Sequence, residues 1–339
     1  MITPPDPHVL AAARAHVDSL AKPPGALGRL EDVAVWLAGC QGVAVPRVPA
    51  RPRCIVLAGD HGVVADGVAS FPSEITVAMI LPILQGRAGV STIAAASGTS
   101  VALYDISVAA PIPGAPEEVG RHKLALGCPS ILTSDALTPA ELDRALATGD
   151  AIAADEAAAG TDLLIVGDLG IGNTTPATAL ICAVLGRDPG DLTGRGAGLD
   201  DAGLARKIEV LRGALDRLGA TDDPRRILAA LGTPDLAVAV ALMLGAAARG
   251  IPILVDGVIA GAEALIASRI DPGVTAWLQA GHRSAEPASS AAIEALGLEP
   301  LLDLGMRLGE GSGAVAAVPL VQAAAAMASR MATLAELMG

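Results

Sequence analysis

Short apolar runs alternate with longer helical patterns along most of the chain. Four runs have the length and composition of buried strands, at residues 54–58, 100–106, 162–166 and 251–255, and weaker candidates lie at 275–278 and 300–302. Helical patterns lie between them, at residues 73–84, 139–158, 175–185, 200–218 and 235–248. Apolar strands that alternate with helices are typical of a parallel sheet covered on both faces. The pattern therefore predicts a three-layer α/β fold.

The two ends of the chain follow a different pattern. Residues 7–20, 27–40 and 313–337 have helical patterns with no strand among them. We therefore expect residues 1–45 and 313–339 to form one small helical domain, and residues 46–312 to form a large α/β domain that binds a nucleotide and carries the catalytic site. Residues 109–136 are rich in Pro and Gly, which predicts a long loop.

Composition narrows the class of protein. Of the 339 residues, 52% are hydrophobic and 17% are charged, which excludes a disordered chain of low hydrophobicity. No uninterrupted apolar run reaches the roughly 18 residues of a membrane span, and the prolines near the N-terminus do not fit a secretory signal. The four cysteines (Cys40, Cys54, Cys128 and Cys182) are far apart, which predicts buried reduced thiols and a cytoplasmic protein.

Charge and aromatic content argue against nucleic-acid binding. The net charge is −13 and only 1% of residues are aromatic. The chain therefore lacks both the excess of basic residues that binds nucleic-acid phosphates and the aromatic side chains on which bases stack. A small anionic substrate remains possible, provided that the positive field is local.

Two candidate sites follow predicted strands, where ligands of parallel α/β sheets bind. In residues 59–63, His61 stands beside Asp60; the two could be an acid–base pair or half of a metal site, or could shape the loop. In residues 167–176, three glycines and Asp168 precede a helix, with Asn173 or Thr174 as its N-cap, and free N–H groups there would suit an anion. The glycine spacing fits neither a Walker A loop nor a dinucleotide fingerprint.

Three further segments combine glycines with charged or hydroxyl side chains. Residues 194–201 precede a helix that carries Lys207, which is either a phosphate ligand or part of a solvated helix face. Ser284 could cap a helix or bind phosphate. Glu310 lies between glycines near Arg307, and a partly desolvated carboxylate there would have a raised pKa and could act as a general base.

Taken together, six segments resemble one family. They are the run KPPGALGRLE at residues 22–31 and residues 58–63, 167–175, 198–201, 281–287 and 307–314, which occur in the family's order and span nearly the whole chain. The family is that of the nicotinate-nucleotide–dimethylbenzimidazole phosphoribosyltransferases. The resemblance implies transfer of the phosphoribosyl group of nicotinate mononucleotide to 5,6-dimethylbenzimidazole, which builds the lower ligand of cobalamin. It also implies a Rossmann-like large domain, a homodimer, and no cofactor or metal.

The resemblance also assigns residues. It places the catalytic glutamate at Glu310 and a second carboxylate at Asp168, where the typical residue is Glu. It places substrate contacts, mainly to the phosphate, at Gly170, Ile171, Gly172, Asn173, Gly196, Lys207, Ser284 and Arg307, and a base pocket at Phe71, Met79 and Leu308. Departures from the family pattern at Ser73, Ala197 and Ala288 leave the preferred base open.

Three alternative functions stay open at this point. The chain could transfer the same group to a phenol, adenine or another benzimidazole. It could be a catalytically silent binding subunit, against which Glu310 argues. A dinucleotide-binding dehydrogenase is disfavoured by the glycine spacing.

Overall fold

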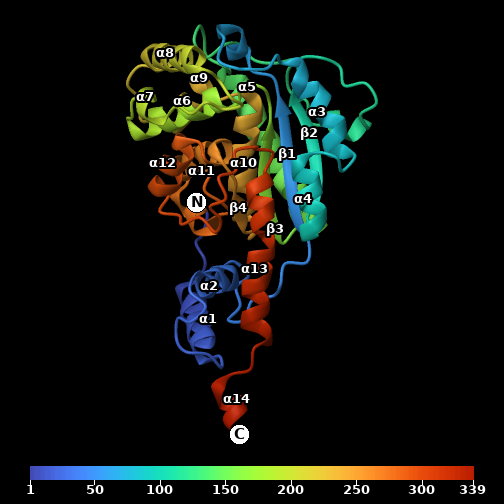
Figure 1. The fold of residues 1–339 in the computed structure, drawn as a ribbon, viewed down its shortest axis with the longest axis vertical. Helices are drawn as coiled ribbons and strands as arrows, with labels where there is room; N and C mark the ends of the chain where they lie inside the picture. Colours follow the sequence, from blue (N-terminus) through green and yellow to red (C-terminus); the bar gives the residue numbers. More distant parts are fainter.

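The computed structural model describes all residues from 1 to 339 and contains one five-stranded sheet (Figure 1). Its strands are β1 (Pro52–Gly59), β2 (Ser100–Ser107), β3 (Leu163–Leu169), β4 (Ile253–Val255) and β5 (Leu278–Ala280). They lie in the order β2-β1-β3-β4-β5 and every pair is parallel. The predicted parallel α/β fold is confirmed.

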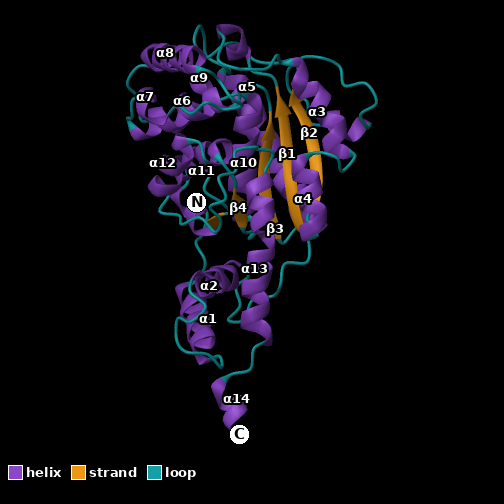
Figure 2. Cartoon of the chain, viewed as in Figure 1, coloured by secondary structure: helices purple, strands orange, loops and turns teal.

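Helices cover both faces of this sheet (Figure 2). Alternate residues of β1 show the two layers: Ile55 and Leu57 belong to one buried cluster, whereas Cys54, Val56 and Ala58 belong to the other. This is the period of two that a strand buried on both faces requires. The helices of this part of the chain are α3 (Glu74–Leu84), α4 (Gly89–Ser97), α5 (Pro139–Ala159), α6 (Thr174–Leu185), α7 (Pro189–Leu192), α8 (Asp201–Leu218), α9 (Pro224–Leu231), α10 (Pro234–Ala248), α11 (Val258–Ile270) and α12 (Pro287–Ala295).

Two local predictions were wrong. Most of residues 275–278 belong to the 3-10 helix η3 (Pro272–Trp277), because Asp271 caps that turn and Pro272 favours its start; β5 begins only at Leu278. Residues 300–302 form no strand, since Pro300 has no N–H to donate and Leu302 makes a single bridge. The predicted helical segment at 313–337 is confirmed, with one break: α13 (Ser312–Arg330) ends before Thr333, which caps α14 (Leu334–Met338).

The terminal helices lie together, away from the sheet. Helix α1 (Pro7–Ser19) packs on α2 (Arg29–Cys40), and α2 packs on α13. Helix α13 starts beside α4 and β3 and then runs down to α1 and α2, so it belongs to both parts of the molecule (Figure 1). Lys22, in the loop between α1 and α2, forms a buried ion pair with Glu31 of α2; its Nζ lies 2.8 Å from Glu31 Oε1. The exact domain boundaries at residues 45 and 313 stay a prediction.

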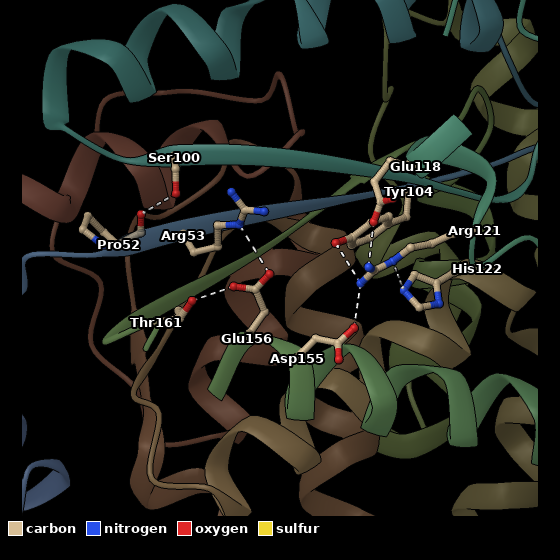
Figure 3. A network of polar contacts seen from close by, with 10 residues as sticks. All are labelled: Pro52, Arg53, Ser100, Tyr104, Glu118, Arg121, His122, Asp155, Glu156 and Thr161. Atoms are coloured by element: carbon tan, nitrogen blue, oxygen red, sulfur yellow. Dashed lines mark hydrogen bonds and ion pairs between the residues drawn. The ribbon is translucent and has the colours of Figure 1, made fainter. Parts of the chain in front are cut away.

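A polar network fixes the long loop to the sheet and to α5 (Figure 3). Arg121 donates to Glu118 Oε1 (2.6 Å), to Asp155 Oδ2 (2.7 Å) and to Tyr104 Oη (3.4 Å), and its Nε donates to His122 Nε2 (2.8 Å). The loop of residues 109–136 is thus irregular, as predicted, apart from a short 3-10 turn (Glu117–Gly120), and is anchored at its centre.

Two helical segments, Glu74–Ser97 and Ser312–Arg330, are long and apolar enough to span a membrane by length and composition alone. Both contribute side chains to the buried cluster on one face of the sheet. Core helices of this kind pass the same test, and no membrane is indicated. All four cysteines are free, as predicted, but Cys128 is only partly buried.

Candidate active site

A cavity opens at the carboxyl ends of β3, β4 and β5. Segments far apart in sequence line it: the end of β3, the residues that follow β4 and β5, and the run that precedes α13. The polar lining residues are Asp168, Asn173, Thr174, Asp256, His282, Ser284, Glu286, Arg307 and Glu310. The cavity lies where ligands of parallel sheets bind.

Glu310 enters this cavity on a special stretch of backbone. Its φ is 61°, and the flanking Gly309 and Gly311 have φ of 86° and 84°. No other residue except glycine has a positive φ in the chain, and such a conformation is uncommon in side-chain-bearing residues. Gly167 in β3 packs against the Glu310 main chain, and a Cβ at Gly167 would overlap the Glu310 carbonyl. The sheet and two glycines therefore hold Glu310 in place.

The Glu310 side chain is 5% exposed. Its Oε2 accepts a hydrogen bond from the Val90 N–H at the start of α4, at 3.3 Å. Burial raises the pKa of Glu310, and the Val90 bond opposes that shift. A carboxylate of raised pKa at a cavity wall can accept a proton from a bound substrate.

Asp168, at the end of β3, lines the same cavity and is also 5% exposed. Asn173 Nδ2 donates to Asp168 Oδ1 at 2.7 Å. Burial and the charge of Asp235 raise the pKa of Asp168 well above its usual value. Asp168 therefore retains its proton to a higher pH than an ordinary aspartate.

His61 lies beside Asp168 and is paired with Asp235, not with its neighbour Asp60. His61 Nε2 lies 2.9 Å from Asp235 Oδ2, and Nδ1 lies 3.2 Å from the Ile171 carbonyl oxygen. Both ring nitrogens face acceptors, so the ring is an imidazolium. Asp235 raises the pKa of His61 to about 9 against the opposing effect of burial. The buried pair with Asp235 fits the loop-shaping interpretation of His61.

Lys207 is buried, which rules out the solvated helix face. Its exposure is 1%, and its Nζ donates to Thr174 Oγ1 at 2.6 Å and to the Gly194 carbonyl at 3.4 Å. Burial lowers the pKa of Lys207 to about 8. Arg307 Nη1 donates to the Gly196 carbonyl at 2.8 Å. The structure thus brings Lys207 and Arg307 to the same loop beside the cavity.

Several other predicted residues lie outside the cavity. Gly170 packs against the His61 ring, and Gly172 packs against Val64. The Ile171 N–H donates to Thr76 Oγ1 at 3.1 Å, so the Ile171 amide is not free to bind an anion. Phe71 is 48% exposed and Met79 is half-buried, and neither lines the cavity. Ser284 and Leu308 do line it; the Ser284 hydroxyl accepts from the Glu286 N–H at 3.3 Å.

Three charged or titratable residues of the lining had no predicted role. Asp256 follows β4 and accepts a hydrogen bond from the Ala314 N–H at 2.8 Å, while His282 and Glu286 follow β5. Asp256 and His282 stand just after apolar strands, which is the signal that identified Asp168, whereas Glu286 lies six residues beyond β5 and has no such signal. No group of three or more His, Cys, Asp or Glu side chains is arranged to hold a metal ion.

Comparison with known proteins agrees with this geometry. A family model described as "Phosphoribosyltransferase" matches residues 2–337. The nicotinate-nucleotide–dimethylbenzimidazole phosphoribosyltransferase of Mycolicibacterium paratuberculosis is 48% identical over 336 residues, which is 99% of this chain and 96% of the relative. The enzyme of the same name from Mycobacterium marinum is 46% identical over 99% of this chain and 93% of its own.

A solved structure, that of CobT from Thermus thermophilus, superposes with a TM-score of 0.93 at 42% identity, over 98% of this chain and 99% of that one. The match extends over the sheet, the cavity and the terminal helices together. The chain therefore belongs to this phosphoribosyltransferase family and is an enzyme that transfers a phosphoribosyl group.

Proposed function

We propose that the chain transfers the phosphoribosyl group of nicotinate mononucleotide to 5,6-dimethylbenzimidazole, giving α-ribazole 5′-phosphate and nicotinate for cobalamin biosynthesis. The names of the relatives support these substrates. The observation that carries the proposal is the position of Glu310, a buried carboxylate of raised pKa held at the cavity wall by left-handed backbone.

Glu310 acts as the general base. One benzimidazole nitrogen attacks C1′ of the ribose while the Glu310 carboxylate takes the proton from the other ring nitrogen. The C1′–N bond of the nucleotide breaks, its electron pair goes to the pyridinium nitrogen, and nicotinate leaves without needing a proton. Attack from the face opposite nicotinate inverts the β-nucleotide to an α-riboside.

Asp168 lines the same cavity as Glu310 and supports the reaction there. Because burial and the charge of Asp235 raise its pKa, Asp168 keeps its proton to a higher pH than an ordinary aspartate, and in that form its carboxyl group offers a hydrogen bond to the ribose or to a bound water. In its ionised form the same group stabilises positive charge at C1′.

The substrate's phosphate lies against the loop that Lys207 and Arg307 hold. Arg307, Ser284 and Gly196 line the cavity, and Lys207 contacts the lining residue Thr174. The two cations supply a local positive field in a chain of net charge −13. Asn173 orients Asp168, and Gly170, Ile171 and Gly172 form the turn that places it. The acceptor base lies beside Leu308, which lines the cavity, whereas Phe71 and Met79, the other expected base-pocket residues, lie outside it.

The chain works as a homodimer in the cytoplasm. Exposed apolar side chains, at Phe71 and at the cavity-lining Leu308, support an arrangement in which a second copy covers them. Sedimentation measures the oligomeric state directly, and a monomer at working concentration would contradict the dimer.

A different acceptor is the second candidate function. It is favoured by one observation: Phe71 and Met79 do not line the cavity, so the pocket that selects the base is incomplete in this chain. Turnover with 5,6-dimethylbenzimidazole, benzimidazole, adenine and a phenol at equal concentration tests this. The highest kcat/KM for 5,6-dimethylbenzimidazole supports the proposal. A higher kcat/KM for another acceptor would show that the chain catalyses the same class of reaction with a different acceptor. A folded chain that binds nicotinate mononucleotide but transfers to none of them would be a silent binding subunit.

A further inference from the structure

Three charged side chains from separate parts of the chain hold one short loop, residues 194–196. Lys207 Nζ donates to the Gly194 carbonyl at 3.4 Å, and Arg307 Nη1 donates to the Gly196 carbonyl at 2.8 Å. From the third direction, Glu286 Oε1 accepts a hydrogen bond from the Gly196 N–H at 3.0 Å. Each side chain binds a different backbone group, so the loop's main chain is fixed from several sides.

The site around Glu286 is built for a carboxylate. Glu286 is 6% exposed and directly precedes α12. Gly194 packs against the carboxylate so closely that a Cβ there would overlap it. At Gly196, where φ is 53°, a Cβ would lie 3.2 Å from Thr174 Oγ1 and 3.7 Å from Lys207 Nζ. The loop therefore brings Glu286, Thr174 and Lys207 together at one end of the cavity.

We propose that Glu286 is a positioning residue for the phosphoribosyl donor, whose carboxylate holds the Gly196 main chain and Lys207 in the arrangement that receives the substrate's phosphate. The inference rests on the phosphate site proposed above. Glu286 does not contact the substrate in this account; it acts through the Gly196 amide and through its charge on Lys207.

The charge of Glu286 shifts the pKa of Lys207 in a defined direction. Burial lowers the pKa of Lys207 to about 8, and the negative charge of Glu286 opposes that shift. The other charged groups at the loop do not replace Glu286: Arg195 turns outward and pairs with Asp201, and Arg307 is itself a cation. Without the carboxylate, Lys207 would lose its proton at lower pH, and phosphate binding would weaken from that lower pH upward.

Glu286→Gln separates charge from hydrogen bonding, because the Gln amide oxygen can still accept from the Gly196 N–H. Glu286→Ala removes both. Glu294→Gln, on the exposed face of the same helix, is the matched control. Three quantities are measured between about pH 6.5 and about pH 9, a range that spans the Lys207 titration. They are KM and kcat for nicotinate mononucleotide, from turnover, and the Kd of ribose 5-phosphate, from calorimetry.

We expect Glu286→Gln to raise KM and the ribose 5-phosphate Kd about tenfold near pH 8, a size typical for a lost charged interaction, with kcat within about twofold. The rise of KM with pH should begin at lower pH than in the parent enzyme. Glu286→Ala should show a raised KM at every pH, and Glu294→Gln should match the parent.

Other results overturn the inference. If Lys207→Met raises the ribose 5-phosphate Kd but Glu286→Gln leaves it unchanged, the phosphate site is supported and the positioning role of Glu286 is contradicted. A tighter Kd would show that the carboxylate competes with the phosphate. If Lys207→Met itself leaves this Kd unchanged, the phosphate site fails, and the inference fails with it.

Discussion

The main chain of Gly167, in β3, packs against the main chain of Glu310, in the segment before α13. A methyl group on Gly167 would overlap the Glu310 carbonyl, so the sheet leaves room for the left-handed backbone of Glu310 only because residue 167 has no side chain. The contact links the most buried layer of the fold to the proposed general base.

Gly167→Ala tests that link. The added methyl group must displace the Glu310 backbone, and a displacement of about 1 Å from productive geometry can cost about 100-fold in rate. We expect kcat to fall by about that factor with a smaller change in KM. Gly120→Ala is the control, since a Cβ there has nothing within 4 Å and Gly120 has an ordinary φ. Equal kcat for the two variants would contradict the proposed constraint.

The pH dependence of the rate follows from Glu310. Burial raises its pKa, and a general base works only when deprotonated. We expect kcat to fall as the pH decreases through a value above the usual range of glutamate, and to be flat above it until other groups titrate. The measurement is a kcat–pH profile with saturating substrates. A rate that stays constant down to the pH of an unperturbed glutamate would contradict the raised pKa or the base role.

Lys207→Met tests the phosphate site. The substitution keeps most of the buried side-chain volume and removes the cation, so the fold should survive. We expect the KM for nicotinate mononucleotide to rise about 10- to 100-fold, the range of a lost charge-assisted hydrogen bond. The kcat should change less than KM. Lys123→Met, at a partly exposed ion pair with Asp105 away from the cavity, provides the comparison and should leave KM unchanged.

The His61–Asp235 pair predicts a stability change at alkaline pH. The folded-state pKa of His61 is raised to about 9 from 6.5, so the pair's contribution is fully present below about pH 6.5 and is lost as the pH rises through about 9. Asp235→Asn leaves a buried imidazolium without its partner and should cost about 3–5 kcal/mol of unfolding free energy. Urea unfolding at several pH values measures both effects. His8→Gln, at an exposed position on α1, should leave the pH dependence as it is.

The large-scale fold was accessible from sequence because buried parallel strands are continuous apolar runs. The predicted runs at 54–58 and 162–166 fall on β1 and β3, although β1 starts two residues earlier and β3 ends three residues later than predicted. Helix α11 was missed because its residues are buried on nearly every side and show no polar face. The start of β5 was misplaced because Val274 and Trp277 are apolar and buried, so only the Asp271 cap distinguishes that turn from a strand.

The candidate site was predictable only in part. Asp168 and Glu310 stand out because each carboxylate lies among glycines, Asp168 at a strand end and Glu310 just before an apolar helix. The partner of His61 could not be read from sequence, since Asp235 is 174 positions away while Asp60 is adjacent. Glu286 was hidden for the same reason: its partner at Gly196 is 90 positions away. Roles that depend on tertiary contacts leave little trace in a local pattern.

The most direct test of the account is product formation from nicotinate mononucleotide and 5,6-dimethylbenzimidazole by the parent enzyme and by Glu310→Ala, measured side by side. The parent should form an α-riboside phosphate and nicotinate in equal amounts. Glu310→Ala should lose about 100- to 10,000-fold in kcat, the usual contribution of a general base, while its Kd for nicotinate mononucleotide stays close to the parent value. A variant that turns over at the parental rate would contradict the assignment of Glu310, and a folded parent that forms no α-riboside phosphate would contradict the proposed reaction itself.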